Sequence, residues 1–129
     1  MFLSKSLCFL PIEFIKLNQD PTQGPEFPVS ISHHGMIKYD EKYIYVIGGI
    51  QNKETSHKTW IVDVTNPNSF IIKKGPRLKG ARSNFAFGKM VIDGKTILIV
   101  EGGGDGKVNL DSVEMLDPTS HQGWTSGKI

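Results

Sequence analysis

The sequence predicts an all-β fold made of two repeated, four-stranded antiparallel units. Two short runs, residues 43–47 and 97–100, are apolar on both faces and rich in β-branched or aromatic residues, which is typical of a strand covered on both sides. A glycine pair follows each run and ends the strand, because glycine permits a sharp bend. The pairs are Gly48 and Gly49 in the first unit and Gly102 and Gly103 in the second. No long stretch shows a clean helical period.

An internal repeat relates the two units. Gly49 and Gly103 lie 54 residues apart. The same offset joins Met36 to Met90, Val46 to Val100, Asp63 to Asp117, and Phe70 to Trp124. The two bulky aromatic residues that end this series are expected to anchor the core. Agreement at one fixed offset indicates a repeat of about fifty residues, a period typical of a propeller blade.

Each unit is expected to contain four strands joined by polar turns. The expected strands lie near residues 31–39, 43–47, 59–64 and 69–73 in the first unit, and near 84–92, 96–101, 112–116 and 122–126 in the second. Asp93 followed by Gly94 is the strongest short hairpin signal of the chain. Asp63 and Asp117 stand in equivalent turns, where a carboxylate caps backbone N–H groups.

The length of 129 residues allows one domain, which we divide into three segments. Residues 1–23 are an N-terminal segment that contributes a stray strand, near residues 12–17, as the last strand of an incomplete blade. Residues 24–74 form the first repeat and residues 75–129 form the second.

The repeated pattern resembles the kelch repeat: an apolar run, two glycines, an apolar residue before Asp, and a bulky aromatic residue further on. Residues 75–84, Gly-Pro-Arg-Leu-Lys-Gly-Ala-Arg-Ser-Asn, are similar to the kelch connection between blades, and His34 fits a position where the family often has His. Four positions depart from the family pattern: Val62 and Leu116 replace a usual Tyr, Phe70 a usual Trp, and Phe85 a usual His. The resemblance covers roughly residues 24–127 and implies a partial kelch-type β-propeller with two four-stranded antiparallel blades.

Composition excludes several classes of partner. The charges are balanced, with 15 basic and 13 acidic residues and no basic block, so neither nucleic acid nor a membrane surface is indicated. Cys8 is the single cysteine, which rules out an internal disulfide and favours a reducing, cytoplasmic location. Residues 1–12 carry a short apolar core, but Pro11 interrupts it and no small-residue cleavage site follows.

No cofactor or metal site is predicted. The glycine-rich stretch 102–107 is not a phosphate loop, because Glu101 stands where that motif needs Gly and Val108 where it needs Ser or Thr. His33 and His34 are neighbours, so on a regular strand they face opposite ways and cannot share one metal ion.

The resemblance places partner binding at the connection between blades. In kelch propellers an Arg, a Ser and an Asn at this connection often meet the bound partner, and Arg82, Ser83 and Asn84 match that stretch. Other candidates are Arg77 and Lys79 in the same connection, Lys107 in the neighbouring one, and His33. A guanidinium group matches a carboxylate in a bidentate way, so a protein or acidic peptide is the expected partner. The alternative is that Arg82 only holds the turn by bonding backbone carbonyls.

Two classes of function follow. The first is a protein–protein interaction module of adaptor or scaffold type, without catalysis. The alternative is a fragment of a propeller enzyme, such as a galactose-oxidase-like copper oxidase or a sugar epimerase; the fold alone does not choose.

The number of repeats predicts incompleteness. Propellers close with about four to eight blades, so the chain is expected to need further blades or self-association. Without further blades, the outer faces of both blades are expected to leave apolar surface uncovered. Its expected members are Ile44, Val46, Leu98 and Val100.

Overall fold

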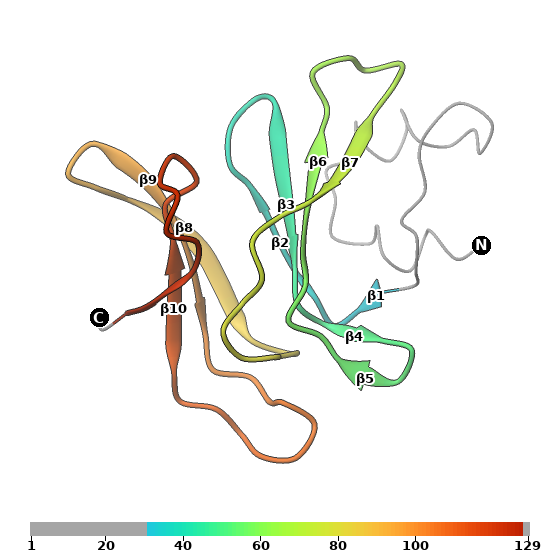
Figure 1. Cartoon of the computed structure of the whole chain (residues 1–129), viewed down its shortest axis with the longest axis vertical. Coiled ribbons are helices and arrows are strands. Elements are labelled where there is room, and N and C mark those ends of the chain that lie inside the picture. The colour runs from blue at the N-terminus through green and yellow to red at the C-terminus, as the bar shows by residue number, and fades with distance from the viewer. Residues whose placement is uncertain (1–30, 128–129) are drawn as a thin grey trace.

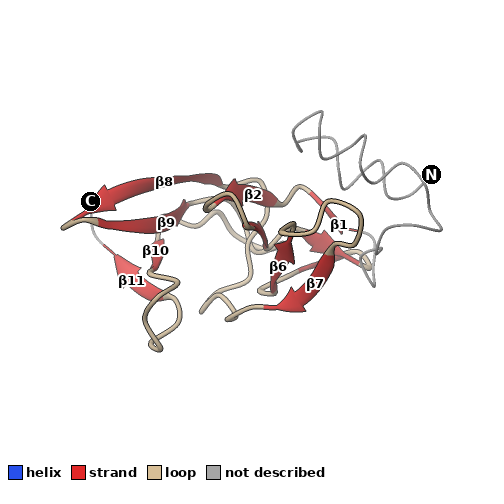
Figure 2. Ribbon diagram, turned by 90° about the horizontal axis from the view of Figure 1, so that it is seen from above, coloured by secondary structure: helices blue, strands red, loops and turns tan. Residues whose placement is uncertain are grey.

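The computed structural model describes residues 31–127, which form β-strands and contain no helix. The strands belong to three antiparallel sheets, two of four strands and one of three. Figure 1 shows the two larger sheets side by side, with the small sheet below the first of them. Figure 2 shows the same strands from above, joined by loops. The prediction of an all-β fold is confirmed for this part of the chain.

The first large sheet has the strand order β2-β3-β6-β7. Its strands are β2 (Gly35–Lys38), β3 (Tyr43–Ile47), β6 (Thr59–Asp63) and β7 (Ile71–Lys74). The turn before β3 is closed by Asp40, whose Oδ1 accepts hydrogen bonds from the backbone N–H groups of Lys42 and Tyr43, both at 2.8 Å. A short polar side chain thus stabilises the turn and starts the strand.

The second large sheet has the strand order β11-β10-β9-β8. Its strands are β8 (Ala86–Ile92), β9 (Lys95–Glu101), β10 (Val113–Leu116) and β11 (Thr125–Gly127). Asp93 and Gly94 connect β8 to β9 with φ angles of 51° and 77°. Two residues with positive φ in a two-residue loop are characteristic of the type I′ turn that the Asp-Gly pair predicts.

The offset of 54 residues holds for the second and third strands of both large sheets. Ile44 of β3 pairs with Val62 of β6, and the residues 54 positions later, Leu98 of β9 and Leu116 of β10, pair in the same way. The repeat seen in the sequence is therefore a repeat of strand register.

The offset fails in the first strand of each sheet. Met36 pairs with Val46, whereas Phe87, and not Met90, pairs with Val100. The β8–β9 hairpin is therefore longer than the β2–β3 hairpin, and the match of Met36 with Met90 is wrong as a structural equivalence. Because Met36 and Met90 are identical and 54 residues apart, the sequence shows no sign of the extra residues in the β8–β9 hairpin.

The small sheet was not predicted. It has the order β1-β4-β5 and consists of two-residue strands: β1 (Ile31–Ser32), β4 (Ile50–Gln51) and β5 (Glu54–Thr55). The single strand expected over residues 31–39 is interrupted at His33, which has a φ of 53°. A left-handed residue cannot continue a strand, because its backbone turns away from the pleat.

The main core lies between the two large sheets. Its buried members are Ile37, Tyr45, Ile47, Leu78, Phe85, Leu98, Val100, Leu116 and Trp124. Trp124 crosses from the second repeat to the first, since its indole N–H contacts Thr59 Oγ1 at 3.3 Å and Pro76 O at 3.0 Å. These contacts show that the two sheets pack face to face.

A second core covers the opposite face of the first sheet. Its buried members are Ile31, Ile44, Val46, Trp60, Val62 and Phe70. The four residues expected to form uncovered apolar surface, Ile44, Val46, Leu98 and Val100, are at most 4% exposed. That expectation is wrong. Leu98 and Val100 belong to the core between the sheets, and Ile44 and Val46 belong to this second core.

The remaining predictions about the N-terminus fall outside residues 31–127. These predictions are the segment 1–23, the strand near 12–17 and the first residues of the repeat at 24. Nothing in the described range is a helix long and apolar enough to cross a membrane.

Candidate functional site

The connection between the sheets is bonded to both of them. Ser83 exchanges two backbone hydrogen bonds with Gly104 of the second repeat, at 2.9 and 3.0 Å. Asn84 N–H donates to His33 O of the first repeat at 3.1 Å. Arg82 N–H donates to Ser56 O at 3.2 Å. Backbone hydrogen bonds of the connection thus bring His33, Arg82, Ser83 and Asn84 close together.

The second glycine of each pair permits this close packing. Gly49 and Gly103 have φ angles of 91° and 80°. A Cβ atom on Gly49 would lie 2.5 Å from Ser32 O, and one on Gly103 would meet Ser83 O at a similarly short distance. Any other residue would combine strained backbone with a steric clash. The two glycines have equivalent roles, which explains why the sequence repeats them.

Arg82 is buried, with only 1% of its surface exposed. Its Nη1 donates to the carbonyl oxygens of Gly102 at 3.1 Å and Ser112 at 3.0 Å. Its Nη2 donates to Ser112 Oγ at 2.9 Å and to Glu114 Oε2 at 3.0 Å. The guanidinium group therefore joins the connection to the end of β9 and to β10.

Glu114 completes a buried ion pair, since its side chain is 4% exposed. Its Oε1 accepts the backbone N–H of Lys79 at 2.6 Å, and its Oε2 accepts that of Gly80 at 3.2 Å as well as the Arg82 contact. The carboxylate thus neutralises the guanidinium and fixes two backbone groups of the connection. Such satisfaction is what a buried charge requires.

The prediction that the Arg82 guanidinium points to the loop surface is wrong, because the residue is only 1% exposed. Its guanidinium makes four hydrogen bonds within the chain, two of them to backbone carbonyls, which agrees with the alternative that Arg82 holds the turn. Glu114 was missed. The signal was present, because a charged residue in the middle of an otherwise apolar central strand needs a buried partner.

Arg77 and Lys79 lie apart from Arg82 in their contacts. Arg77 Nη1 lies 3.0 Å from His57 Nε2, on the side of the first repeat. The side chain of Lys79 is exposed, while its backbone is held by Glu114. The basic residues of the connection thus do not form one cluster.

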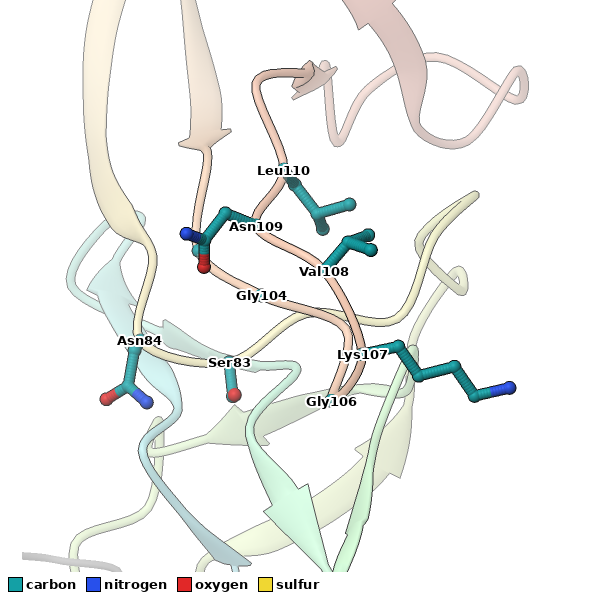
Figure 3. A pocket seen from close by; sticks show the side chains of 9 residues that line it. Ser83, Asn84, Gly104, Gly106, Lys107, Val108, Asn109 and Leu110 are labelled. Carbon is teal, nitrogen blue, oxygen red and sulfur yellow. The ribbon is translucent and has the colours of Figure 1, made fainter.

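A hollow of about 940 Å³ lies between the connection and the glycine-rich loop that follows β9. Its polar lining comes from Ser83, Asn84, Lys107 and Asn109. Figure 3 shows the amides of Asn84 and Asn109 on one side of the loop, while the Lys107 side chain extends to the other. The amides offer both donors and acceptors to a ligand backbone.

The loop itself is held by Asp105. Its Oδ1 accepts the backbone N–H groups of Lys107 at 2.8 Å and Val108 at 2.9 Å. These bonds, first that of Val108 and then that of Lys107, hold the pKa of the Asp105 carboxyl below its usual value. The carboxylate therefore stabilises the turn, and the ammonium group of Lys107 is left to the surface.

A second hollow of about 450 Å³ lies on the other side of the same loop. Lys79 and Lys107 both line it, together with the buried pair of Arg82 and Glu114. Across residues 31–127, no ion pair joins either lysine ammonium to a carboxylate. Three cations, Lys79, Arg82 and Lys107, line the hollow against two carboxylates, Asp105 and Glu114, a net charge of 3 − 2 = +1. This small positive balance suits a carboxylate.

Asp63 and Asp117 cap turns, as their equivalent positions predict. Asp63 Oδ1 accepts the N–H of Thr65 at 3.0 Å, and Asp117 Oδ1 accepts that of Thr119 at 2.9 Å. Hydrogen bonds from the two threonines, side chain first, lower the pKa of both carboxyl groups.

The described residues contain no group of three His, Cys, Asp or Glu side chains placed to hold one metal ion. His34 is 4% exposed and belongs to the interior.

Comparison with known proteins gives one kind of likeness. No protein-family model matches the chain, and no curated protein matches it either. Among solved structures, a fungal alcohol oxidase of the AA5 family, in complex with copper, matches with a TM-score of 0.62 and 18% identity. The match covers 77% of this chain and 22% of that protein, so the chain spans less than a quarter of its length. At this identity the likeness shows the fold alone: the sheets are arranged as in part of that oxidase.

Proposed function

We propose that the chain is a protein-interaction segment of a β-propeller whose loop face binds an acidic stretch of a partner protein. The observation that carries this proposal is the hollow beside Lys79 and Lys107, two exposed cations that form no ion pair within residues 31–127. A glutamate or aspartate side chain seated between them would gain two charge-assisted hydrogen bonds.

The buried pair supports this role indirectly. Arg82 and Glu114 fix the backbone of Lys79 and Gly80, so the hollow exists before a ligand arrives. A preformed site avoids the entropy cost of ordering a loop on binding. Arg82 therefore serves the site by positioning it, while Lys79 and Lys107 make the contact.

The neighbouring amides extend the site. Asn84 and Asn109 line the adjoining hollow across the same loop. Their donors and acceptors suit the backbone of an extended peptide, so one segment could place its acidic side chain by the lysines and its backbone by the amides. The partner class is thus an extended acidic peptide within a protein, and a cytoplasmic adaptor or scaffold role belongs to the same proposal.

The affinity of a fluorescent Glu-rich peptide for the whole chain tests the proposal. The double change Lys79→Ala and Lys107→Ala should weaken binding about tenfold or more, and binding should weaken with added salt. Lys42→Ala, in the turn before β3, is the matched control and should leave affinity unchanged. Equal affinities of the double variant and the wild type would contradict the proposal.

A second candidate is that the chain is a segment of a propeller oxidase. The observation in its favour is the fold likeness to the copper-bound alcohol oxidase, at 18% identity. Stoichiometric copper retained by the purified chain after dialysis would favour this candidate. Copper at background level, together with lysine-dependent peptide binding, would favour the interaction module.

A further inference from the structure

The second large sheet has one incompletely covered face. Side chains alternate along a strand, so on β9 Leu98 and Val100 face the first sheet, while Ile97 and Ile99 face the opposite way. Leu98 and Val100 belong to the core between the sheets, whereas Ile97 and Ile99, each 9% exposed, belong to neither core cluster. We call the side that carries Ile97 and Ile99 the outer face.

The neighbouring strand leaves the outer face open. On β8, Gly88 pairs with Ile99 and Met90 pairs with Ile97, so both lie on this face. Met90 is 42% and Ile92 is 37% exposed. A Cβ atom at Gly88 would meet no other atom within 4 Å, and a hollow of about 240 Å³ lies over this part of β8 and β9. The open apolar surface of this face is therefore supplied by Met90 and Ile92, with Ile97 and Ile99 beneath it. Exposed apolar surface beside a hollow marks an interaction site.

The internal repeat indicates what such a face contacts. The residues of the first sheet that stand 54 positions before Ile97 and Ile99 are Tyr43 and Tyr45. Tyr45 is buried against the second sheet, and Tyr43 packs against the same core. The outer face is therefore the structural equivalent of a face that packs on another β-sheet within this molecule.

The charges of the outer face are self-complementary. Lys95 and Glu101 stand at opposite ends of β9. They lie on the same face as Ile97 and Ile99, because these four residues occupy every second position of the strand. Rotating a second copy by half a turn places Lys95 of one copy opposite Glu101 of the other, and Ile97 opposite Ile99. Opposite charges then meet at both ends of the apolar strip, which is the requirement for an isologous interface.

Head-to-tail stacking of copies is disfavoured. It would use the face of the first sheet that is equivalent to the inner face of the second, and that face carries Ile44, Val46 and Val62. These residues are at most 4% exposed within the chain itself. We infer that the chain forms a two-fold symmetric dimer through the outer faces of two β8–β9 hairpins. This inference is independent of the loop-face proposal.

Sedimentation velocity at micromolar concentrations tests the dimer with paired charge reversals. Lys95→Glu alone and Glu101→Lys alone each put like charges at both ends of the strip, and each should weaken the dimer about tenfold. An equimolar mixture of the two variants should restore it as a heterodimer, because opposite charges then face each other again. Glu54→Lys, on β5, is the matched control and should dimerise like the wild type.

A change at the centre of the strip guards against a folding artefact. Lys95 also lies 3.6 Å from Asp117, so Lys95→Glu can disturb the chain locally. Met90→Asp is at an exposed position and should abolish the dimer while leaving the circular dichroism melting curve unchanged. A monomeric wild type, open-ended polymers that grow with concentration, or a mixture no tighter than its separate variants would each overturn the inference.

Discussion

Replacing Arg82 with alanine is expected to destabilise the fold strongly. The substitution removes four hydrogen bonds, to Gly102 O, Ser112 O, Ser112 Oγ and Glu114 Oε2, all between 2.9 and 3.1 Å. It also leaves the carboxylate of Glu114, which is 4% exposed, without its counter-ion. Breaking a buried pair by removing one partner typically costs about 3–5 kcal/mol.

Thermal unfolding followed by circular dichroism measures this effect. A change of 1 kcal/mol shifts the melting temperature by about 2–8 °C across common domain sizes, so the loss in Arg82→Ala should be on the order of 10 °C or more. Arg82→Lys should also be destabilising, because a single ammonium group cannot reproduce the planar fork of bonds.

A double-mutant cycle separates the pair from its surroundings. Glu114→Gln removes the charge and keeps one acceptor oxygen, which can accept the N–H of Lys79 or that of Gly80 but not both in the present geometry. In the double variant Arg82→Ala with Glu114→Gln, no buried charge is left unpaired, so its loss should be smaller than the sum of the single losses. A loss below about 1 kcal/mol for Arg82→Ala is typical of an exposed pair and would refute the reasoning.

Three further predictions concern the turns and the interior. Gly103→Ala should lower the free energy of unfolding, measured with a chemical denaturant, by about 1–3 kcal/mol or more. The φ of 80° is strained for alanine and the new Cβ meets Ser83 O. Gly88→Ala is the control and should be close to neutral, because no atom lies within 4 Å of the added Cβ. Hydrogen bonds lower the pKa of Asp105 below its ordinary value of 3.8, so its contribution to stability is present above that value and is lost as the pH falls through the folded-state pKa. In Asp105→Ala, the free energy of unfolding should therefore fall less steeply with decreasing pH at the acid end. An unchanged acid limb would count against this. Burial raises the pKa of Tyr45 from 10.0 to about 12, so folding favours the neutral phenol. The stability that this confers is present below pH 10.0 and is lost as the pH rises toward 12. Tyr45→Phe should remove one late step from the ultraviolet titration of tyrosinate.

The sequence predicted the elements that a single strand pattern determines. The runs before the glycine pairs are β3 and β9, and each is apolar enough to be recognised without its partners. The Asp-Gly turn of the β8–β9 hairpin was equally local, since Asp93 and Gly94 alone provide the required positive φ angles. The glycine pairs themselves repeat because Gly49 and Gly103 meet the same kind of neighbour.

The small sheet could not be predicted in the same way. Its strands are two residues long, too short to show a period. They exist because His33, Asn52 and Lys53 adopt positive φ angles that turn the chain back on itself. Asn tolerates that conformation well, but lysine and histidine give little warning of it.

The connection was singled out from the sequence, but the contacts of the Arg82 side chain were not predicted from it. Ser83, Asn84 and His33 do come together, because the connection is bonded between the repeats. The direction of Arg82 depends on Glu114, a residue 32 positions later on another strand. The offset of 54 contained a hint, since it places Glu114 where the first repeat has the buried Trp60. A charge at that position is tolerated only with a buried partner.

Backbone chemical-shift mapping of the whole labelled chain, titrated with a Glu-rich peptide, tests the loop-face account most directly. The account predicts that the largest shifts fall on Lys79, Gly80, Asp105 and Lys107 around the second hollow, and that they disappear in the Lys79→Ala and Lys107→Ala double variant. Shifts confined to the β8–β9 hairpin, or no shifts at saturating peptide, would contradict it.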